Sequence, residues 1–152
     1  MTDQPRPSLS LGLSYRDPRA AIAWLEKAFG FETTMIIENP DGSIGHSELR
    51  VGDGLIMVYG EYGDRHRSPA SLNGVNSQSG HVQLENGLDA HCERARAAGA
   101  VITREPADQF YGDRNYIAVD PEGHVWSFAQ TQVVMSPEEM AKAGGVTVRD
   151  RL

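Results

Sequence analysis

The chain has 152 residues, of which 14 are basic and 21 acidic, so its formal net charge is −7. This length suits one domain, which can bury about two-thirds of the surface that its unfolded chain exposes. Because the basic residues are spread along an acidic chain, nucleic acid is not expected as a partner. The N-terminal stretch lacks the apolar core of a signal peptide, and no segment approaches the roughly 18 apolar residues of a membrane helix. We therefore expect a cytoplasmic protein without a membrane contact.

The first half of the chain predicts a βαβββ unit. Residues 9–15 alternate between apolar and small side chains, as a half-buried strand does. Asp17 and Pro18 form an N-cap and a first helical turn, and Gly30 is a natural C-cap, which predicts a helix over 18–29. Three strands are expected after it, at 31–38, 44–51 and 55–60, separated by turns rich in glycine and aspartate.

The second half repeats this order after an aperiodic loop at 61–79. We predict a strand at 80–85, a helix at 88–98 closed by Gly99, and strands at 100–104, 114–120 and 124–130. A constant offset of 69 carries Gly30 to Gly99 and Gly54 to Gly123, which indicates an internal repeat. Beyond it, Ser136 and Pro137 open a capping box, so a short C-terminal helix is expected.

These patterns predict an α+β fold in one domain over 1–152. Module one spans about 8–61, a linker about 62–79, module two about 80–131 and a tail 132–152. One helix and four strands cannot bury a sheet face alone, so the modules should associate and form a cupped eight-stranded mixed sheet. Cys92, the only cysteine, excludes an intrachain disulfide and should be a buried small side chain in a reducing compartment.

The chain resembles the vicinal oxygen chelate superfamily, which includes glyoxalases, bleomycin-resistance proteins and extradiol dioxygenases, over residues 8–131. The resemblance is carried by motifs at both helix ends, by the loop at 111–114, and by the Asp-Pro-Glu-Gly-His run at 120–124. It implies paired βαβββ modules, a small-molecule ligand in the cup and a homodimer. In its enzymes it also implies a divalent metal held by His or Gln on the first strand, and Glu on the last strand, of each module.

Most of the metal ligands that the resemblance implies are missing. His81 matches the histidine of module two, but its repeat counterpart is Gly12. The glutamate positions fall at Ser127 and at Val58, or at Met57 if the register slips by one residue. Divalent metals need several oxygen or nitrogen donors, so no metal site and no cofactor is expected, with a divalent metal as the less favoured alternative.

One unorthodox metal site stays open. His46 and Glu48 are two residues apart on a strand and share a face, so they could join His81 if that face looked into the cup. Strand alternation favours the simpler interpretation, in which His46, Glu48 and Arg50 form a solvated face.

Six residues are candidates for contact with a ligand. On strand alternation His81 and Gln83 face the cup, and His81 is also the one candidate general base. Arg114 offers a planar fork for a carboxylate, although a scaffold role in its hairpin is favoured. Trp126 should pack in the core. The candidate ligand contacts are His81, Ser14, Gln83, Ser127, Tyr111 and Arg114.

Three functions remain open at this stage. The favoured one is a metal-free binder that sequesters a small planar or cationic molecule, and the net negative charge weakly favours a cationic guest. The alternative is a glyoxalase-like lyase or isomerase that uses His81, with or without a metal. The third is an interaction or dimerisation module without a small ligand.

Overall fold

The computed structural model describes residues 5–152; residues 1–4 of the N-terminal stretch discussed above lie outside it. Module one consists of β1 (Leu11–Tyr15), α1 (Pro18–Phe29), β2 (Glu32–Glu38), β3 (Ile44–Val51) and β4 (Gly54–Gly60). Module two consists of β5 (Ser79–Leu84), α2 (Leu88–Ala97), β6 (Val101–Asp108), β7 (Asp113–Val119) and β8 (Val125–Thr131). The tail carries α3 (Pro137–Gly144). The predicted α+β class and the two βαβββ modules are confirmed.

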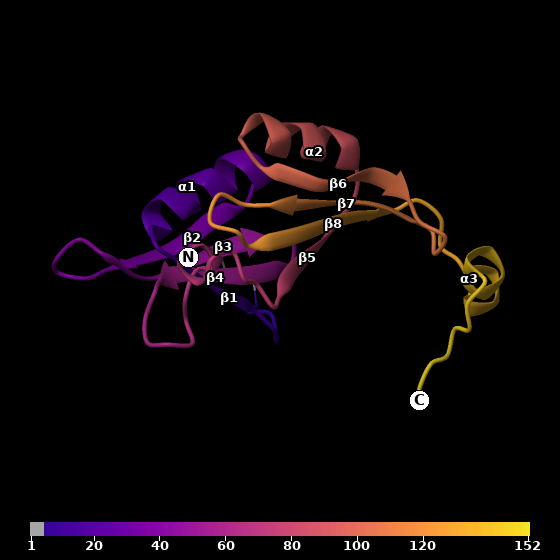
Figure 1. Ribbon diagram of the computed structural model, residues 1–152, viewed down its shortest axis with the longest axis horizontal. Coiled ribbons are helices and arrows are strands. Elements are labelled where there is room, and N and C mark those ends of the chain that lie inside the picture. The colour runs from indigo at the N-terminus through magenta and orange to yellow at the C-terminus, as the bar shows by residue number, and fades with distance from the viewer. Residues whose placement is uncertain (1–4) are drawn as a thin grey trace.

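Each module forms a four-stranded mixed sheet of the same order, β1-β4-β3-β2 and β5-β8-β7-β6. The first and last strands of each module pair in parallel, and the other pairs are antiparallel. Helices α1 and α2 lie side by side over the sheets, and α3 stands at one end of the molecule, beyond the end of β8 and the turn between β6 and β7 (Figure 1). The opposite faces of the two sheets are therefore not covered by these helices.

The helix boundaries follow from their caps. The Asp17 carboxylate accepts a hydrogen bond from the Ala20 amide at 2.9 Å, and Gly30 ends α1 with φ of 71°. The guanidinium of Arg94 on α2 donates to the last carbonyl groups of α1, at Glu26 and Lys27. Because this cap comes from the other module, it also joins the two helices.

The core is shared between the modules. Phe29, at the end of α1, packs on Phe128 and Trp126 of β8 with ring centroids 4.7 and 5.6 Å apart. His91 of α2 lies against the same cluster and links Tyr116 to the Phe29 carbonyl. Trp126 is 1% exposed, which confirms its predicted place in the core. Neither sheet would bury its apolar face without the other module.

The Asp120-Pro-Glu-Gly-His run connects three parts of the chain. The buried Asp120 carboxylate accepts from the Tyr15 hydroxyl at 2.6 Å and from Trp126 Nε1 at 3.2 Å. Glu122 accepts from the backbone amides of residues 16 and 17 and from the Ser68 hydroxyl. The motif therefore holds β1, the linker and β8 together.

Most predicted bounds lie within two residues of the observed ones, and two predictions differ more. The linker is not without secondary structure, because Ser68 caps a 3-10 helix, η1 (Pro69–Leu72). Strand β6 runs to Asp108, well past the predicted end at 104, because two register shifts keep it paired with β7. Pro106 is tolerated there because irregular pairing does not require its missing amide.

Candidate functional site

The uncovered face of module one gathers side chains from three neighbouring strands. Met57 of β4 lies directly between Gly12 of β1 and Glu48 of β3 in the strand registers. Tyr59 and Ser14 form the next pair along the same face. Leu13, Val58 and Leu49 point the other way, into the core. The polar and sulfur-bearing side chains thus form the floor of the concave side.

Gly12 is required here by a close approach. The Tyr59 side chain lies over this glycine, and a Cβ atom at position 12 would lie 2.4 Å from its hydroxyl oxygen. Burial and the neighbouring Tyr62 hydroxyl raise the pKa of Tyr59, so the phenol stays protonated at neutral pH. The position that would supply a histidine or glutamine ligand in a metalloenzyme is therefore filled by the Tyr59 side chain.

The strand registers also decide which residue of module one corresponds to Ser127. His81 pairs with Ser127, and Gly12 pairs with Met57, so the counterpart is Met57 and not Val58. The repeat offset is 69 for the first pair of positions and 70 for the second, because the module-two hairpin is one residue longer. Met57 has no carboxylate, and its thioether does not suit a hard divalent cation.

His46 and Glu48 do not form the solvated face that strand alternation suggested. Glu48 pairs with Met57 on the concave side and is 6% exposed. His46 Nε2 lies 3.3 Å from its carboxylate, and the Arg6 guanidinium is bonded to the same oxygen. Although burial raises it, the contacts with His46 and Arg6 hold the pKa of Glu48 below its usual value. The sequence could not show that Arg6, which is 42 positions away, pairs with this carboxylate.

A pocket of about 430 Å³ opens on this face between the β1 and β4 strands and the linker. Ser14 lines it, but the other five candidate ligand contacts do not. One signal for this pocket is present in the sequence, namely the concentration of aromatic, basic and amide side chains in the aperiodic linker. The lining residues are Leu11, Gly12, Leu13, Ser14, Met57, Tyr59, Arg65, His66, Arg67, Pro69, Leu72, Val75, Asn76, Ser77, Gln78, Ser79, Gly80, His124 and Val125.

Three aromatic rings are grouped at this pocket. The rings of Tyr62 and His66 stack with centroids 4.1 Å apart and planes 11° from parallel. Tyr59 lies 5.6 Å from Tyr62. A backbone hydrogen bond from the Tyr62 amide to the His66 carbonyl, 3.1 Å long, closes the loop that presents them. Flat rings with accessible faces and edges suit contact with an aromatic guest.

The concave face of module two carries three of the candidate ligand contacts, His81, Ser127 and Gln83. His81 Nδ1 lies 3.2 Å from the Ser127 hydroxyl, and the histidine is exposed. Gln83 donates to the Thr131 hydroxyl at 2.9 Å. As strand alternation predicted, His81 and Gln83 point away from Val82 and Leu84, which pack against the core. These polar groups are arranged on an open face and not around the pocket.

Tyr111 joins the same face through Asn115. The buried Asn115 side chain donates to the Tyr111 hydroxyl at 2.8 Å and accepts from Arg104 at 2.7 Å. The amide thus fixes the positions of a phenol and a guanidinium on the concave side of module two.

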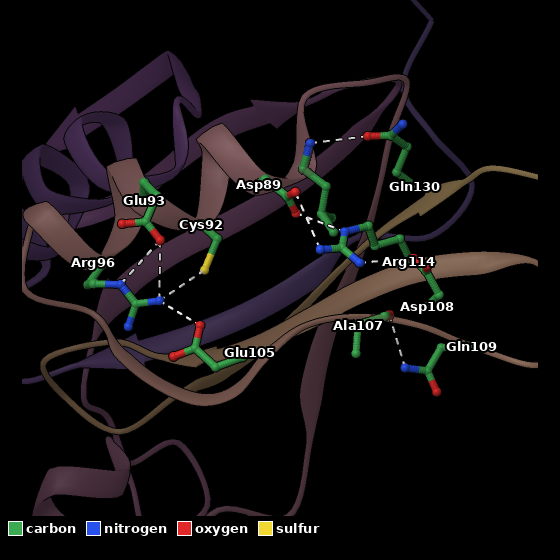
Figure 2. A network of polar contacts seen from close by, with 11 residues as sticks. Asp89, Cys92, Glu93, Arg96, Glu105, Ala107, Asp108, Gln109, Arg114 and Gln130 are labelled. Atoms are coloured by element: carbon green, nitrogen blue, oxygen red, sulfur yellow. Dashed lines mark hydrogen bonds and ion pairs between the residues drawn. The ribbon is translucent and has the colours of Figure 1, made fainter.

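Arg114 lies on the helix side of its sheet. Its guanidinium contacts Asp89 of α2 and Asp108 of β6, each at 2.9 Å (Figure 2). Figure 2 also shows Arg96 between Glu93 and Glu105, with the sulfur of Cys92 nearby. Cys92 is fully buried, and burial raises the pKa of its thiol, so it is a packing residue as predicted.

The residues present do not fit the metal site of the related enzymes. Tyr59 fills the space above Gly12, and Met57 and Ser127 replace both carboxylates. Within residues 5–152 no three His, Cys, Asp or Glu side chains are grouped so as to hold a metal ion. Among the same residues, no helix is long and apolar enough to cross a membrane.

The comparisons with known proteins agree with this fold. Residues 9–128 match the Glyoxalase/Bleomycin resistance protein/Dioxygenase superfamily, and the chain belongs to it. An uncharacterised protein of Mycobacterium bovis is 31% identical over 141 residues, which cover 90% of this chain and 91% of the relative.

Solved structures extend the comparison. TioX from Micromonospora sp. ML1 is 32% identical with a TM-score of 0.66, covering 86% of this chain and all of TioX. TnmS3, an antibiotic-binding protein from Streptomyces sp. CB03234, has a TM-score of 0.62 over 80% of this chain and 93% of its own. At 17% identity, TnmS3 is evidence for the fold alone.

Proposed function

We propose that the protein binds a small organic molecule without a metal ion, in the pocket on the concave face of module one, and so sequesters it. The pocket itself is the observation that carries this proposal. Its volume of about 430 Å³ lies within the range of small-molecule sites, and its floor combines apolar side chains with a few polar ones. The buried free Cys92 fits action in a reducing compartment such as the cytoplasm.

Two further facts support a binder over a metalloenzyme. The Tyr59 hydroxyl occupies the space where a metal-binding side chain at position 12 would lie, so this position forms part of the pocket wall. TnmS3 is an antibiotic-binding protein of the same fold, so this architecture is compatible with binding.

We further propose that the binding form is a homodimer. Both concave faces lie on the side of the sheets away from α1 and α2, so one chain leaves them open (Figure 1). In the dimer, module two of a second copy would face the pocket and bring His81, Gln83, Ser127 and Tyr111 toward the ligand. Sedimentation equilibrium tests this state, and a protein that stays monomeric at all concentrations would refute it.

The first experiment is elemental analysis of protein purified without chelator or an affinity metal. We expect less than one tenth of an equivalent of Mn, Fe, Ni or Zn per chain. About one equivalent that chelation removes, with loss of thermal stability, would refute metal-free binding.

The pocket is tested with Gly12→Val. The added side chain would displace the Tyr59 ring toward the pocket, since the Cβ atom has no room beside the hydroxyl. Gly60→Val is the matched control, because this strand glycine has open space around it and does not line the pocket. Compounds that raise the melting temperature of the native protein and the control, but not of Gly12→Val, are bound in the pocket. A Gly12→Val protein that folds and binds every such compound normally would place binding elsewhere.

The alternative is a lyase or isomerase with His81 as the acid-base group. Only the 3.2 Å contact with Ser127 favours it, since a hydroxyl can orient an imidazole. Conversion of a bound compound by the native protein, abolished in His81→Ala, would establish this alternative.

A further inference from the structure

The pocket differs in charge from the rest of the chain. The protein has a formal net charge of −7, yet the residues lining the pocket include two arginines and two histidines, and no aspartate or glutamate. The net charge of the chain is negative, whereas the charged side chains that line the pocket are basic. Such a cavity favours an anionic guest, because low-dielectric walls strengthen the field of the groups inside it.

The positive charge available to a ligand comes mainly from Arg65. Arg67 is partly neutralised, since its Nε atom lies 3.3 Å from the Glu61 carboxylate. His124 is buried, and its Nε2 atom is held by the Ser14 carbonyl at 2.8 Å. Arg65 makes no ion pair within residues 5–152, although Asp64 is its neighbour in sequence. Its planar guanidinium can therefore hold a carboxylate through two hydrogen bonds.

The shape of the remaining wall indicates a flat molecule. The rings of Tyr59 and His66 line the pocket, and the His66 ring is stacked on Tyr62. The amide and hydroxyl side chains of residues 76–79 also line the pocket and add hydrogen-bonding groups. A guest with an aromatic body and one acidic group would meet rings along its faces and Arg65 at its edge.

We infer that the ligand is a planar aromatic carboxylate, with its ring system against Tyr59 and His66 and its carboxylate on Arg65. This inference rests on the proposed function, because it names the class of molecule that the same pocket binds. It replaces the cationic guest that net charge alone favours, since the local charge of a site outweighs that of distant, screened groups.

The test uses three probes of one shape in isothermal titration calorimetry: 2-naphthoate, the neutral 2-naphthamide and the cationic 2-naphthylmethylammonium. We expect naphthoate to bind about tenfold more tightly than naphthamide, and the cation to bind most weakly. Arg65→Gln should weaken naphthoate about tenfold and leave naphthamide unchanged. Arg149→Gln is the matched control, because this substitution removes the same charge at an exposed arginine of the tail that does not line the pocket.

Each outcome decides the matter. If Arg65→Gln affects naphthoate and naphthamide equally, or if Arg149→Gln weakens naphthoate as much, no specific carboxylate contact exists and the inference is overturned. If the amide or the cation binds as well as naphthoate to the native protein but not to Gly12→Val, the binding function stands and only the ligand class is wrong. If none of the probes binds at millimolar concentration, the pocket does not bind planar aromatic carboxylates and the inference is overturned, while the proposed function is still tested by the compounds that Gly12→Val distinguishes.

Discussion

Replacement of Asp120 by asparagine should lower the stability of the whole domain, since this carboxylate joins both modules. One carboxylate oxygen accepts from the amides of residues 122 and 124, each at 3.0 Å, and the other from Tyr15 and Trp126. Asparagine keeps one acceptor and turns the other oxygen into a donor. In either orientation of the amide, at least one buried N–H group then faces another donor.

The expected cost follows from that mismatch. A buried donor left without its acceptor costs about 1 to 3 kcal/mol, and the loss of a charged acceptor adds to it. We therefore expect Asp120→Asn to lower the free energy of unfolding by about 2 to 3 kcal/mol, which for a chain of this size lowers the melting temperature by about 5 to 10 °C.

Urea unfolding followed by tryptophan fluorescence and by circular dichroism would measure this loss. Asp53→Asn is the control, because Asp53 lies exposed in the β3–β4 turn. A double-mutant cycle with Tyr15→Phe should give a coupling energy of about 1 to 2 kcal/mol, since the 2.6 Å hydrogen bond is lost only once. A change below about 0.5 kcal/mol in Asp120→Asn, equal to that of Asp53→Asn, would refute the reasoning.

Three more predictions test other parts of the structure. Burial lowers the pKa of His91, so its contribution to stability is present above its unfolded pKa of about 6.5 and is lost as the pH falls through the lower folded value. In urea unfolding between about pH 7 and 5, His91→Gln should therefore lose less stability with falling pH than the native protein does. An equal dependence of stability on pH in both proteins would contradict the lowered pKa of His91. Gly112→Ala should make the tail more sensitive to proteases and lower the melting temperature. Gly112 has a φ of 98°, and an added Cβ would lie 2.0 Å from the Val133 carbonyl oxygen. Protease resistance equal to that of the native protein would show that this close approach is not needed to hold the tail. His81→Ala should leave the melting temperature within about 2 °C, since the side chain is exposed, while it weakens ligand binding in the dimer; simple unfolding of this variant would speak against a role at the open face.

Local chemistry made most of the elements predictable. The helix at 18–29 was predicted with its observed bounds, because Asp17, Pro18 and Gly30 act on the adjacent turns of the backbone. The C-terminal helix was found through its capping box, which is confirmed by Ser136 and Glu139. The less local features were missed, such as the continuation of β6 to Asp108, which depends on pairing with β7.

The candidate site was predictable only in part. Alternation correctly placed His81 and Gln83 on the side away from the core, and family motifs located the positions where metal ligands are missing. Alternation failed for Glu48, because it shows that residues share a face but not what covers that face. Arg6, which is 42 positions away, is bonded to the buried Glu48 carboxylate.

The sequence by itself therefore determined the two modules, their helices, their repeated order and the family, since caps, turns and strand alternation act over a few residues. Only the tertiary structure decided that Met57 is the counterpart of Ser127, that Tyr59 fills the space above Gly12, and that the linker closes a pocket with Arg65 at its side. Each of these depends on strand register or on contacts between distant segments. Such contacts form when the two modules bury a common core, and they cannot be predicted from local sequence patterns.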